Sequence, residues 1–376
     1  SHVTPEVVPP ALAIAERDAL SGRNLITALA VGCETTTRVG LGLDYPAFRA
    51  RGWHGPGVIG PFGAAAAVGR LLGFDPETMA AAFGLAGSQA AGTFAAWGTP
   101  TVKFHQCRGA LSGLMAALLA QQTFVAPRQF LTAPDGGLYN AYSNGGRPEA
   151  VVEALGRRWE LEQISLRVWP SASAIQGMIT AVFELVEKHG QTAERTKALH
   201  VSLGKAAFDM HGGFSTYRGK FEALLSGHYA AAAILHDREL TLAQFEPARY
   251  NDPALQSFAA ERVSVGGDPA LAAAQAVVEA ETADGATITV RCEHPRGAPG
   301  NPLSRAELEG KFRTYARTRL PAGRIEEVLG LVSRLETLDS TRRLMDLLRT
   351  DDLAAVHAHH STSRRSGRKN PATSGP

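Results

Sequence analysis

The sequence predicts a mainly α-helical protein that contains a smaller α+β part. Apolar residues recur at three- and four-residue steps through most of the first 160 residues, which is the spacing of one helix face. β-rich segments begin only at about residue 164, and the helical spacing returns after about residue 303. The chain has 376 residues, 44% of them hydrophobic, and is long enough for two compact domains.

Six segments of the first part have helical spacing, and Pro, Gly or Asp marks their borders. They are residues 9–20, 22–38, 60–72, 76–94, 108–122 and 148–157. Small residues, such as the four alanines at 64–67, would let these helices cross at close range. We therefore predict an all-helical first part over residues 1–163.

The second part, residues 164–300, is predicted to be α+β. Its expected strands at 198–203 and 262–265 alternate with expected helices at 172–188 and 221–235. Residues 277–281 and 287–292 form a hairpin pattern, because Asp284-Gly285 between two alternating runs is a strong turn signal.

The helical pattern returns in a third segment, residues 301–360. Ser304 is a predicted N-cap, and Glu307 three residues later completes a capping box. We expect helices up to about residue 359. Residues 361–376 are polar and basic, which predicts a disordered, solvated tail outside the core.

Composition excludes several classes of function. The net charge is +2 with the basic residues spread along the chain, so nothing indicates a nucleic-acid partner. No apolar run reaches the roughly 18 residues of a membrane-spanning helix, and no targeting segment opens the chain, so a cytoplasmic location is the default expectation. The three cysteines and the histidines lack metal-ligand spacing, which predicts no metal site.

Three motifs resemble those of one enzyme family. They are Gly52-Trp53-His54, the Gly-Pro-Phe-Gly run that opens residues 60–67, and Lys103-Phe104-His105. Together they resemble the MmgE/PrpD family, cofactor-free lyases and isomerases of small polycarboxylic acids that include 2-methylcitrate dehydratase, cis-aconitate decarboxylase and iminodisuccinate epimerase. The resemblance extends to about Leu348.

This resemblance implies a domain organisation and an oligomeric state. Residues 1–163 and 301–360 would form one discontinuous helical domain, residues 164–300 an α+β lid, and the active site would lie between them. A homodimer is also implied. Members of the family carry a further N-terminal segment of roughly 80–90 residues, including an acidic part of the active site, ahead of the position of Ser1; either the gene product is truncated, or the numbered sequence omits its beginning.

The resemblance assigns catalytic roles to His2, Lys103 and His105. His2 would act as general acid or base, because imidazole titrates near neutral pH; the alternative is a terminal histidine without a partner. Lys103 would contact a substrate carboxylate, although a one-residue difference in spacing leaves Arg108 as an alternative cation. The resemblance implies neither a metal nor a cofactor.

Substrate-binding roles are implied for six residues, three of them on the lid side: His54, Arg108, Arg167, Ser226, His228 and Tyr229. Pro56 stands where the family has a threonine after the Gly-Trp-His motif. Residues 55–60 also satisfy the pattern GxGxxG, but no strand precedes them, so a dinucleotide site is not expected. The two alternatives are a helix start at Gly60 whose backbone N–H groups face an anionic group and a purely structural loop. Tyr229 could equally be a core aromatic.

Arg167 occupies a position where the family has lysine, and Gln176 one where many members have histidine. Arginine stays protonated and grips a carboxylate with a planar fork, so Arg167 suits binding better than proton transfer. Both changes disfavour decarboxylation.

The predicted pocket takes a di- or tricarboxylate. Fixed cations on one carboxylate would stabilise the charge left when a neighbouring C–H proton departs, and a second proton carrier would decide the reaction. The first expectation is a hydro-lyase of the 2-methylcitrate dehydratase type. The alternatives are an isomerase or epimerase, a decarboxylase, or a catalytically silent dimeric carboxylate-binding homologue.

Overall fold

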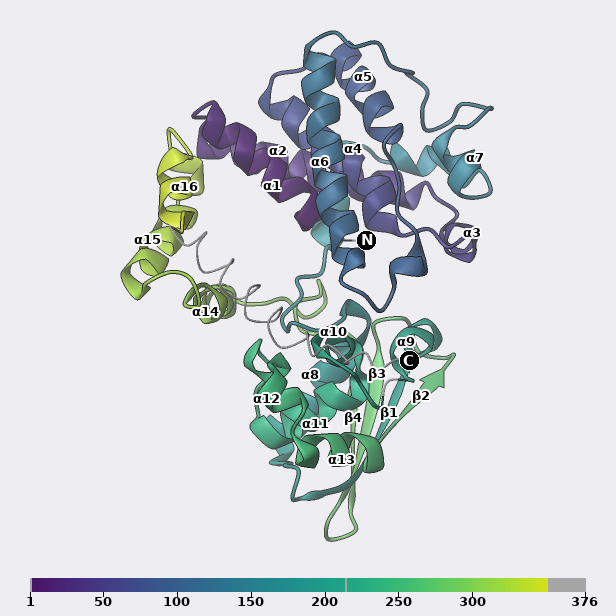
Figure 1. Cartoon of the computed structure of the whole chain (residues 1–376), viewed down its shortest axis with the longest axis vertical. Helices are drawn as coiled ribbons and strands as arrows, with labels where there is room; N and C mark the ends of the chain where they lie inside the picture. Colours follow the sequence, from purple (N-terminus) through teal and green to yellow (C-terminus); the bar gives the residue numbers. More distant parts are fainter. Residues whose placement is uncertain (1, 214, 351–376) are drawn as a thin grey trace, which may run out of the picture. The chain divides into compact units, whose positions relative to one another are not determined.

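A computed structural model describes residues 2–213 and 215–350 of the chain (Figure 1). The fold is mainly helical, with a four-stranded mixed sheet, as the sequence predicts. The chain divides into two compact units: Ser1–Ala11 with Ala28–Leu308, and Leu12–Thr27 with Glu309–Pro376. The division into a helical domain of 1–163 and 301–360 and a lid of 164–300 stays a prediction.

The helical part of the first unit is built on three mutually packed helices, α4, α5 and α6 (Figure 1). The helices up to residue 163 are α1 (Thr4–Arg17), α2 (Gly22–Leu41), α3 (Tyr45–Ala50), α4 (Gly55–Leu71), α5 (Pro76–Gly87), α6 (Thr101–Gln121) and α7 (Leu138–Tyr142). Glycine lets α4 and α6 approach closely, since a Cβ on Gly113 would lie 2.3 Å from the carbonyl oxygen of Pro61.

Two helix starts differ from the prediction. Helix α4 begins at Gly55 and not at Gly60, so the expected anion-facing helix start at Gly60 is wrong; Gly60 is buried inside the helix. Helix α6 begins at Thr101 and not at residue 108, which places Lys103 and His105 in its first two turns. Helix α5 ends at Gly87, because the chain beyond it pairs with the α4 entry: His54 N–H donates to Gly92 O at 3.0 Å.

The predicted helix at 148–157 is wrong. Only Pro148–Val151 forms a 3-10 turn there. Arg38, buried in α2, donates to the backbone carbonyls of residues 151, 153 and 158, which a helix would need for its own hydrogen bonds. Ala154 and Gly156 also have positive φ angles of 50° and 78°, which no right-handed helix contains.

The α+β part follows the predicted strands closely. Its elements are α8 (Gln176–His189), β1 (Thr196–Gly204), α9 (Lys205–His211), α10 (Lys220–Leu225), α11 (Gly227–Asp237), α12 (Pro247–Tyr250), α13 (Pro253–Glu261), β2 (Val263–Asp268), β3 (Ala276–Thr282) and β4 (Thr287–Cys292). The sheet order is β2-β1-β3-β4. β1 pairs parallel with β2 and antiparallel with β3, and β3 and β4 form the predicted hairpin.

One face of this sheet is covered by α8 and α11 (Figure 1). Alternating residues of β1 show this: Leu199 and Val201 are buried, while His200 between them is exposed. The predicted helix at 221–235 is two helices, because Ser226 ends α10 and its hydroxyl accepts a hydrogen bond from Tyr229 N–H at 3.0 Å, capping α11.

The remaining helices are α14 (Arg305–Ala316), α15 (Ala322–Val332) and α16 (Arg342–Leu348). The predicted capping box is confirmed: Ser304 N–H donates to Glu307 Oε2 at 2.8 Å, and Glu307 N–H donates back to Ser304 Oγ at 3.3 Å. Val328, Leu331 and Leu344 form the small core of the second unit.

Short 3-10 turns complete the described chain, at Phe94–Ala96, Pro148–Val151, Glu160–Gln163, Ser173–Ile175, Ala243–Phe245 and Leu335–Thr337. The predicted helix beyond residue 350 and the predicted tail at 361–376 lie outside the described residues. Within residues 2–213 and 215–350, the helices are all too short or too polar to cross a membrane.

Candidate active site

Five of the predicted site residues come together in the first unit: His2, His54, Lys103, His105 and Arg167. The charges of Arg167, Lys103 and His54 contribute to lowering the pKa of His2. Those of His105 and Lys103 contribute to lowering the pKa of His54. The residues come from separate stretches of the chain: the N-terminus, the start of α4, the start of α6 and the loop before α8. The fold therefore assembles a group that we call the histidine–cation group.

His2 lies against Arg167. Its Nδ1 atom is 3.4 Å from Arg167 Nη2, and since a guanidinium only donates, Nδ1 is the acceptor of this long hydrogen bond. Burial, followed by the charges of Arg167 and Lys103, lowers the pKa of His2 to about 3. His2 is therefore neutral at pH 7, with its proton on Nε2 and its one lone pair, on Nδ1, directed at Arg167.

His54 and His105 form an imidazole pair. Their Nδ1 atoms are 2.9 Å apart, so one Nδ1 carries a hydrogen and the other offers a lone pair. His54 is the N-cap residue of α4 and only 9% exposed. Burial lowers its pKa to about 4, with the charge of His105 as the next cause, and burial also lowers the pKa of His105. Both imidazoles are thus expected to be neutral at pH 7.

Lys103 supplies a positive charge from the first turn of α6. By surface area its side chain is exposed, yet enough protein surrounds the ammonium group that desolvation, followed by the charge of Arg167, lowers its pKa. Two neighbouring cations, of which Arg167 lowers the pKa of Lys103, are a favourable place for a polyanion.

The segment that carries Arg167 is fixed on both sides. Leu166 N–H donates to Gly297 O at 2.8 Å. Gly297 has φ +92°, and a Cβ there would lie 2.0 Å from Leu166 O, so only glycine fits this approach. On the other side, the buried Gln176 amide accepts from Trp169 N–H and donates to Trp169 O, both at 3.3 Å. Gln176 therefore holds the loop that carries Arg167 in place.

The other four predicted residues are placed differently. Arg108 lies on α6, three residues after His105, and is half-buried. Ser226, His228 and Tyr229 are all buried on α11. Ser226 caps that helix, and the Tyr229 hydroxyl donates to Gln244 O. Burial lowers the pKa of His228. Their roles in substrate binding stay a prediction.

Two residues beside the site were missed by the sequence reasoning. Arg49 of α3 stacks 3.4 Å over the Phe94 ring and is the third cause, after burial and His105, of the lowered His54 pKa. Glu6 of α1 is fully buried, and neither carboxylate oxygen has a hydrogen-bond partner among the described residues. Helical spacing could have found Glu6, because it lies on the same face as the buried Val3, Val7 and Pro10.

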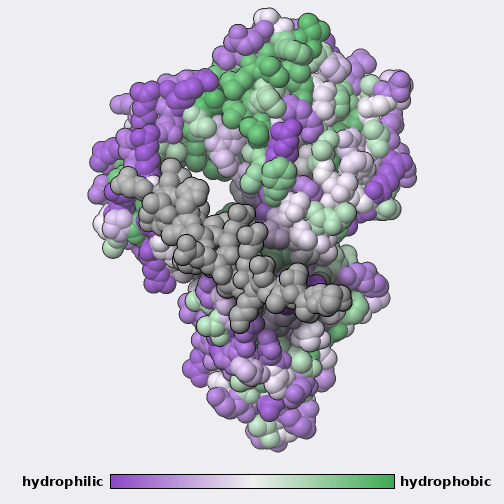
Figure 2. All heavy atoms as spheres, in the orientation of Figure 1, coloured by the Kyte–Doolittle hydropathy of each residue, from purple (hydrophilic) through white to green (hydrophobic). Residues whose placement is uncertain are grey.

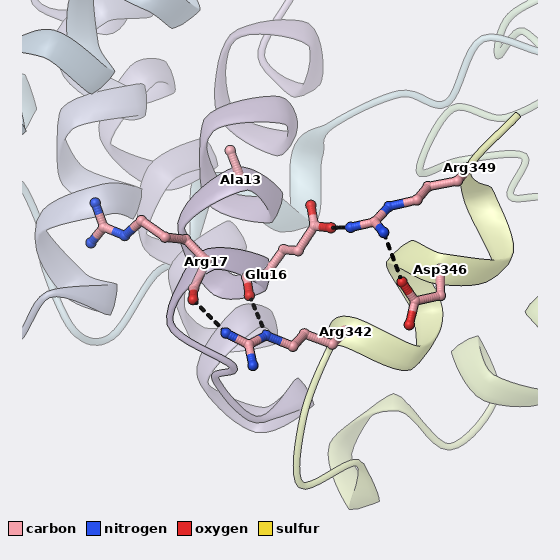
Figure 3. Close-up of a pocket in the computed structure, with 6 residues that line it drawn as sticks. All are labelled: Ala13, Glu16, Arg17, Arg342, Asp346 and Arg349. Atoms are coloured by element: carbon pink, nitrogen blue, oxygen red, sulfur yellow. Dashed lines mark hydrogen bonds and ion pairs between the residues drawn. The ribbon is translucent and has the colours of Figure 1, made fainter. Parts of the chain in front are cut away.

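A hollow of about 470 Å³ lies in the second unit, away from all these residues (Figure 3). Figure 3 shows Arg342 and Arg349 reaching from α16 to the last turn of α1. Arg342 donates to the carbonyl oxygens of Glu16 and Arg17, and Arg349 pairs with the Glu16 carboxylate at 2.5 Å. These contacts satisfy the free carbonyls at a helix end, so we assign this hollow a structural role.

No metal-ligand set is visible in the described part of the chain. Over residues 2–213 and 215–350, no group of three His, Cys, Asp or Glu side chains could hold an ion. The free cysteines are also separate, with Cys33 and Cys292 buried and Cys107 exposed.

The two-part architecture and the histidine–cation group define a helical protein with an α+β part and a site suited to small polyanions. The chain belongs to the MmgE/PrpD family. The MmgE/PrpD N-terminal domain matches residues 1–151, and the MmgE/PrpD C-terminal domain matches residues 169–336.

Similar curated proteins carry cis-aconitate decarboxylase names. The cis-aconitate decarboxylase-like protein oryM of Aspergillus oryzae is 28% identical over 92% of this chain and 77% of its own length. The cis-aconitate decarboxylase of Aspergillus terreus is 27% identical over 93% of this chain and 75% of its own. The human cis-aconitate decarboxylase is 27% identical over 93% of this chain and 74% of its own.

Proposed function

We propose that this protein is a cofactor-independent lyase that acts on a small tricarboxylic acid. The observation that carries the proposal is the contact between His2 and Arg167, 3.4 Å apart, with Lys103 close enough to act on both. It combines a neutral imidazole with two cations, and carbanion chemistry beside a carboxylate uses a proton carrier together with positive charge.

Each residue has a separate task in this proposal. Arg167 and Lys103 bind different carboxylates of one substrate, and they stabilise the negative charge that spreads into the carboxylate next to the reacting carbon. His2 carries the proton to or from that carbon. The His54–His105 pair, which has one hydrogen between its two Nδ1 atoms, is the remaining polar part of the proposed site. No step requires a metal-bound species.

We take decarboxylation of a cis-aconitate-like acid as the first reaction to test. It is supported by the names of relatives that align with 92–93% of this chain. In that reaction the bond to one carboxylate breaks as CO₂ leaves, the electron pair stays on the adjacent carbon, and a proton then forms the new C–H bond.

Dehydration is the second candidate, and Arg167 favours it. A guanidinium binds and stabilises charge but does not give up its proton, which reduces the number of proton donors for decarboxylation at this position. A hydro-lyase would use His2 to remove the C–H proton and a second group to protonate the departing hydroxyl. Isomerisation and epimerisation follow from the same first step.

A homodimer fits this protein. Three exposed apolar residues, Phe104, Leu111 and Met115, follow one another at seven- and four-residue steps along α6. Figure 2 shows apolar side chains gathered over the α6 region on this face. An exposed apolar stripe of this kind is typical of a protein–protein contact, and a second copy of this chain is the partner that we propose.

The test is turnover of purified protein followed by NMR in deuterated water. Cis-aconitate, citrate and 2-methylcitrate are supplied separately. Loss of CO₂ identifies a decarboxylase, loss of water a hydro-lyase, and deuterium incorporation without net conversion an isomerase or epimerase. Binding without any of these would indicate the catalytically silent carboxylate-binding protein, and absence of binding by all three acids would overturn the proposal.

A further inference from the structure

Two short backbone segments bring the imidazoles of His54 and His105 together. Residues 52–54 and 92–94 form a small antiparallel ladder, in which His54 N–H donates to Gly92 O at 3.0 Å. Gly92 has φ +123°, and a Cβ there would lie 3.1 Å from His105 Nδ1. One segment thus carries His54, and the backbone of the other packs on the His105 ring. The register of these segments, which we call the histidine ladder, therefore determines the 2.9 Å distance between the two Nδ1 atoms.

Arg49 of α3 contacts both segments of the histidine ladder. Its Nη1 atom donates to Trp53 O, directly before His54, at 2.8 Å. Its guanidinium carbon lies 3.4 Å from the centre of the Phe94 ring, which belongs to the second segment. The same ring packs edge-to-face with the His54 imidazole, with the ring centroids 5.6 Å apart. The guanidinium of Arg49 therefore joins the two segments next to the imidazole pair.

The Phe94 ring is enclosed on both faces. The Trp97 indole stacks on it, with centroids 4.9 Å apart and 14° between the planes. A guanidinium and an indole at these distances would collide on one face of a ring, so Arg49 and Trp97 occupy opposite faces. The stack fixes the plane of the Phe94 ring, and with it the ring's contact with His54.

Helix α3 has its own anchors and does not need the Arg49 guanidinium for its place. Its N-cap, Asp44, accepts a hydrogen bond from Ala47 N–H at 3.2 Å, and the Phe48 side chain is fully buried. A guanidinium attracts an aromatic face by its charge and donates N–H groups in its plane, whereas an apolar end group does neither. Loss of the guanidinium should therefore act on the histidine ladder and leave α3 in place.

We propose that Arg49 is a positioning residue for the His54–His105 pair, and that its guanidinium sets the register of the histidine ladder through the Trp53 carbonyl and the Phe94 ring. It keeps the two Nδ1 atoms within hydrogen-bond distance, so the pair presents one arrangement of its hydrogens to the substrate. Since Arg49 acts through His54, its loss lowers kcat more than it raises KM. This role in catalysis rests on the proposed function.

The experiment compares Arg49→Met with Arg51→Met. Methionine keeps an unbranched apolar side chain and removes the guanidinium. Arg51 is a matched control, because it caps the same helix and also donates to a backbone carbonyl, that of Ser143, but lies outside the histidine ladder. NMR of the free proteins with ¹⁵N-labelled histidine detects the hydrogen between the two Nδ1 atoms. Its signal should be lost in Arg49→Met and kept in Arg51→Met. In Arg49→Met, kcat should fall by up to about 10²-fold with KM nearly unchanged.

Three results would overturn the inference and leave the proposed function standing. They are a signal that persists in Arg49→Met, a signal that is lost equally in Arg51→Met, and a raised KM with unchanged kcat in Arg49→Met, which would mean that Arg49 binds the acid itself. If Arg49→Met does not fold, Phe94→Leu decides, because it removes the ring but not the Trp53 contact: persistence of the signal there would equally overturn the inference.

The proposed function fails separately. If the natural sequence neither binds nor converts cis-aconitate, citrate or 2-methylcitrate, the catalytic role of Arg49 falls with the proposed function. The NMR signal needs no substrate, so it still shows whether Arg49 positions the imidazole pair. Absence of the signal in the natural sequence would overturn the pair, and the inference with it.

Discussion

The helical part and the α+β part of the first unit contain similar polar residues in opposite settings. In the helical part, His54, Lys103 and His105 lie at the starts of α4 and α6, where a helix end meets a loop. In the α+β part, Ser226, His228 and Tyr229 lie on α11, where every residue from Gly227 to Leu235 is buried. Side chains at helix ends stay available for chemistry. Side chains on a fully enclosed helix serve in capping and packing instead.

Arg167 is the exception that links the two settings. It belongs to the loop before α8, and Gln176 and Gly297 fix that loop from either side. Its guanidinium reaches His2, so it shares the electrostatics of the helical part. We therefore propose that the first group of residues acts on an anion and that the second supports the fold, and each of the following changes tests this separation.

Glu6→Gln has the largest expected effect on stability. The pKa of Glu6 is raised from 4.5 to about 8 in the folded state, so its contribution to the unfolding free energy falls as pH rises between those values. The loss amounts to as much as about 5 kcal/mol. Denaturant unfolding at acidic and mildly alkaline pH should show a smaller pH-dependent loss for Glu6→Gln. Parallel pH dependence in the two proteins would contradict the buried-acid assignment.

His2→Gln has the largest expected effect on catalysis. Removal of a general base lowers kcat by about 10²–10⁴-fold, while the partly exposed position of His2 leaves the unfolding free energy nearly unchanged. Steady-state kinetics with the substrate found by the turnover test measures this. A His2→Gln protein as active as the natural one would remove His2 from the mechanism.

Arg167→Ala and Lys103→Ala come next. Loss of one charged partner from a desolvated carboxylate contact costs about 2–5 kcal/mol, so each variant should lower kcat/KM by roughly two or three orders of magnitude with the fold intact. Arg167→Lys sharpens the test, since it adds a possible proton donor but loses the planar fork. Unchanged turnover in both alanine variants would show that the substrate site lies elsewhere.

Tyr229→Phe probes the opposite side of the comparison. Its hydroxyl is buried and donates to Gln244 O, so its removal should cost about 1 kcal/mol of stability with little change in kcat/KM. Thermal unfolding and kinetics of the same preparation give both numbers. A hundredfold loss of activity at unchanged stability would show that Tyr229 belongs to the substrate site.

Chelation has the smallest expected effect. After dialysis against a strong chelator, kcat should be unchanged, because the proposed chemistry uses only side-chain cations and imidazoles. Elemental analysis accompanies the assay. Stoichiometric zinc or iron in the untreated protein, together with loss of activity on its removal, would contradict the cofactor-independent mechanism.

Much of the fold could be predicted from periodicity and turn chemistry. The β3–β4 hairpin and the Ser304–Glu307 capping box are local, so the residues that form them are neighbours in sequence. The segment 148–157 could not be predicted, because its conformation depends on Arg38, more than 100 residues away. The distant Arg38 guanidinium binds backbone carbonyl groups of this segment, so its local helical pattern does not produce a helix.

By itself, the sequence determined the mainly helical class, the α+β part, the family and the residues His2, His54, Lys103, His105 and Arg167 as candidates. Only the tertiary structure decided which of the candidates meet, that α11 is enclosed, and that neither carboxylate oxygen of Glu6 has a hydrogen-bond partner among the described residues. The reason is physical. Helices, turns and motifs follow from neighbours along the chain, whereas desolvation and charge coupling depend on distances across the fold.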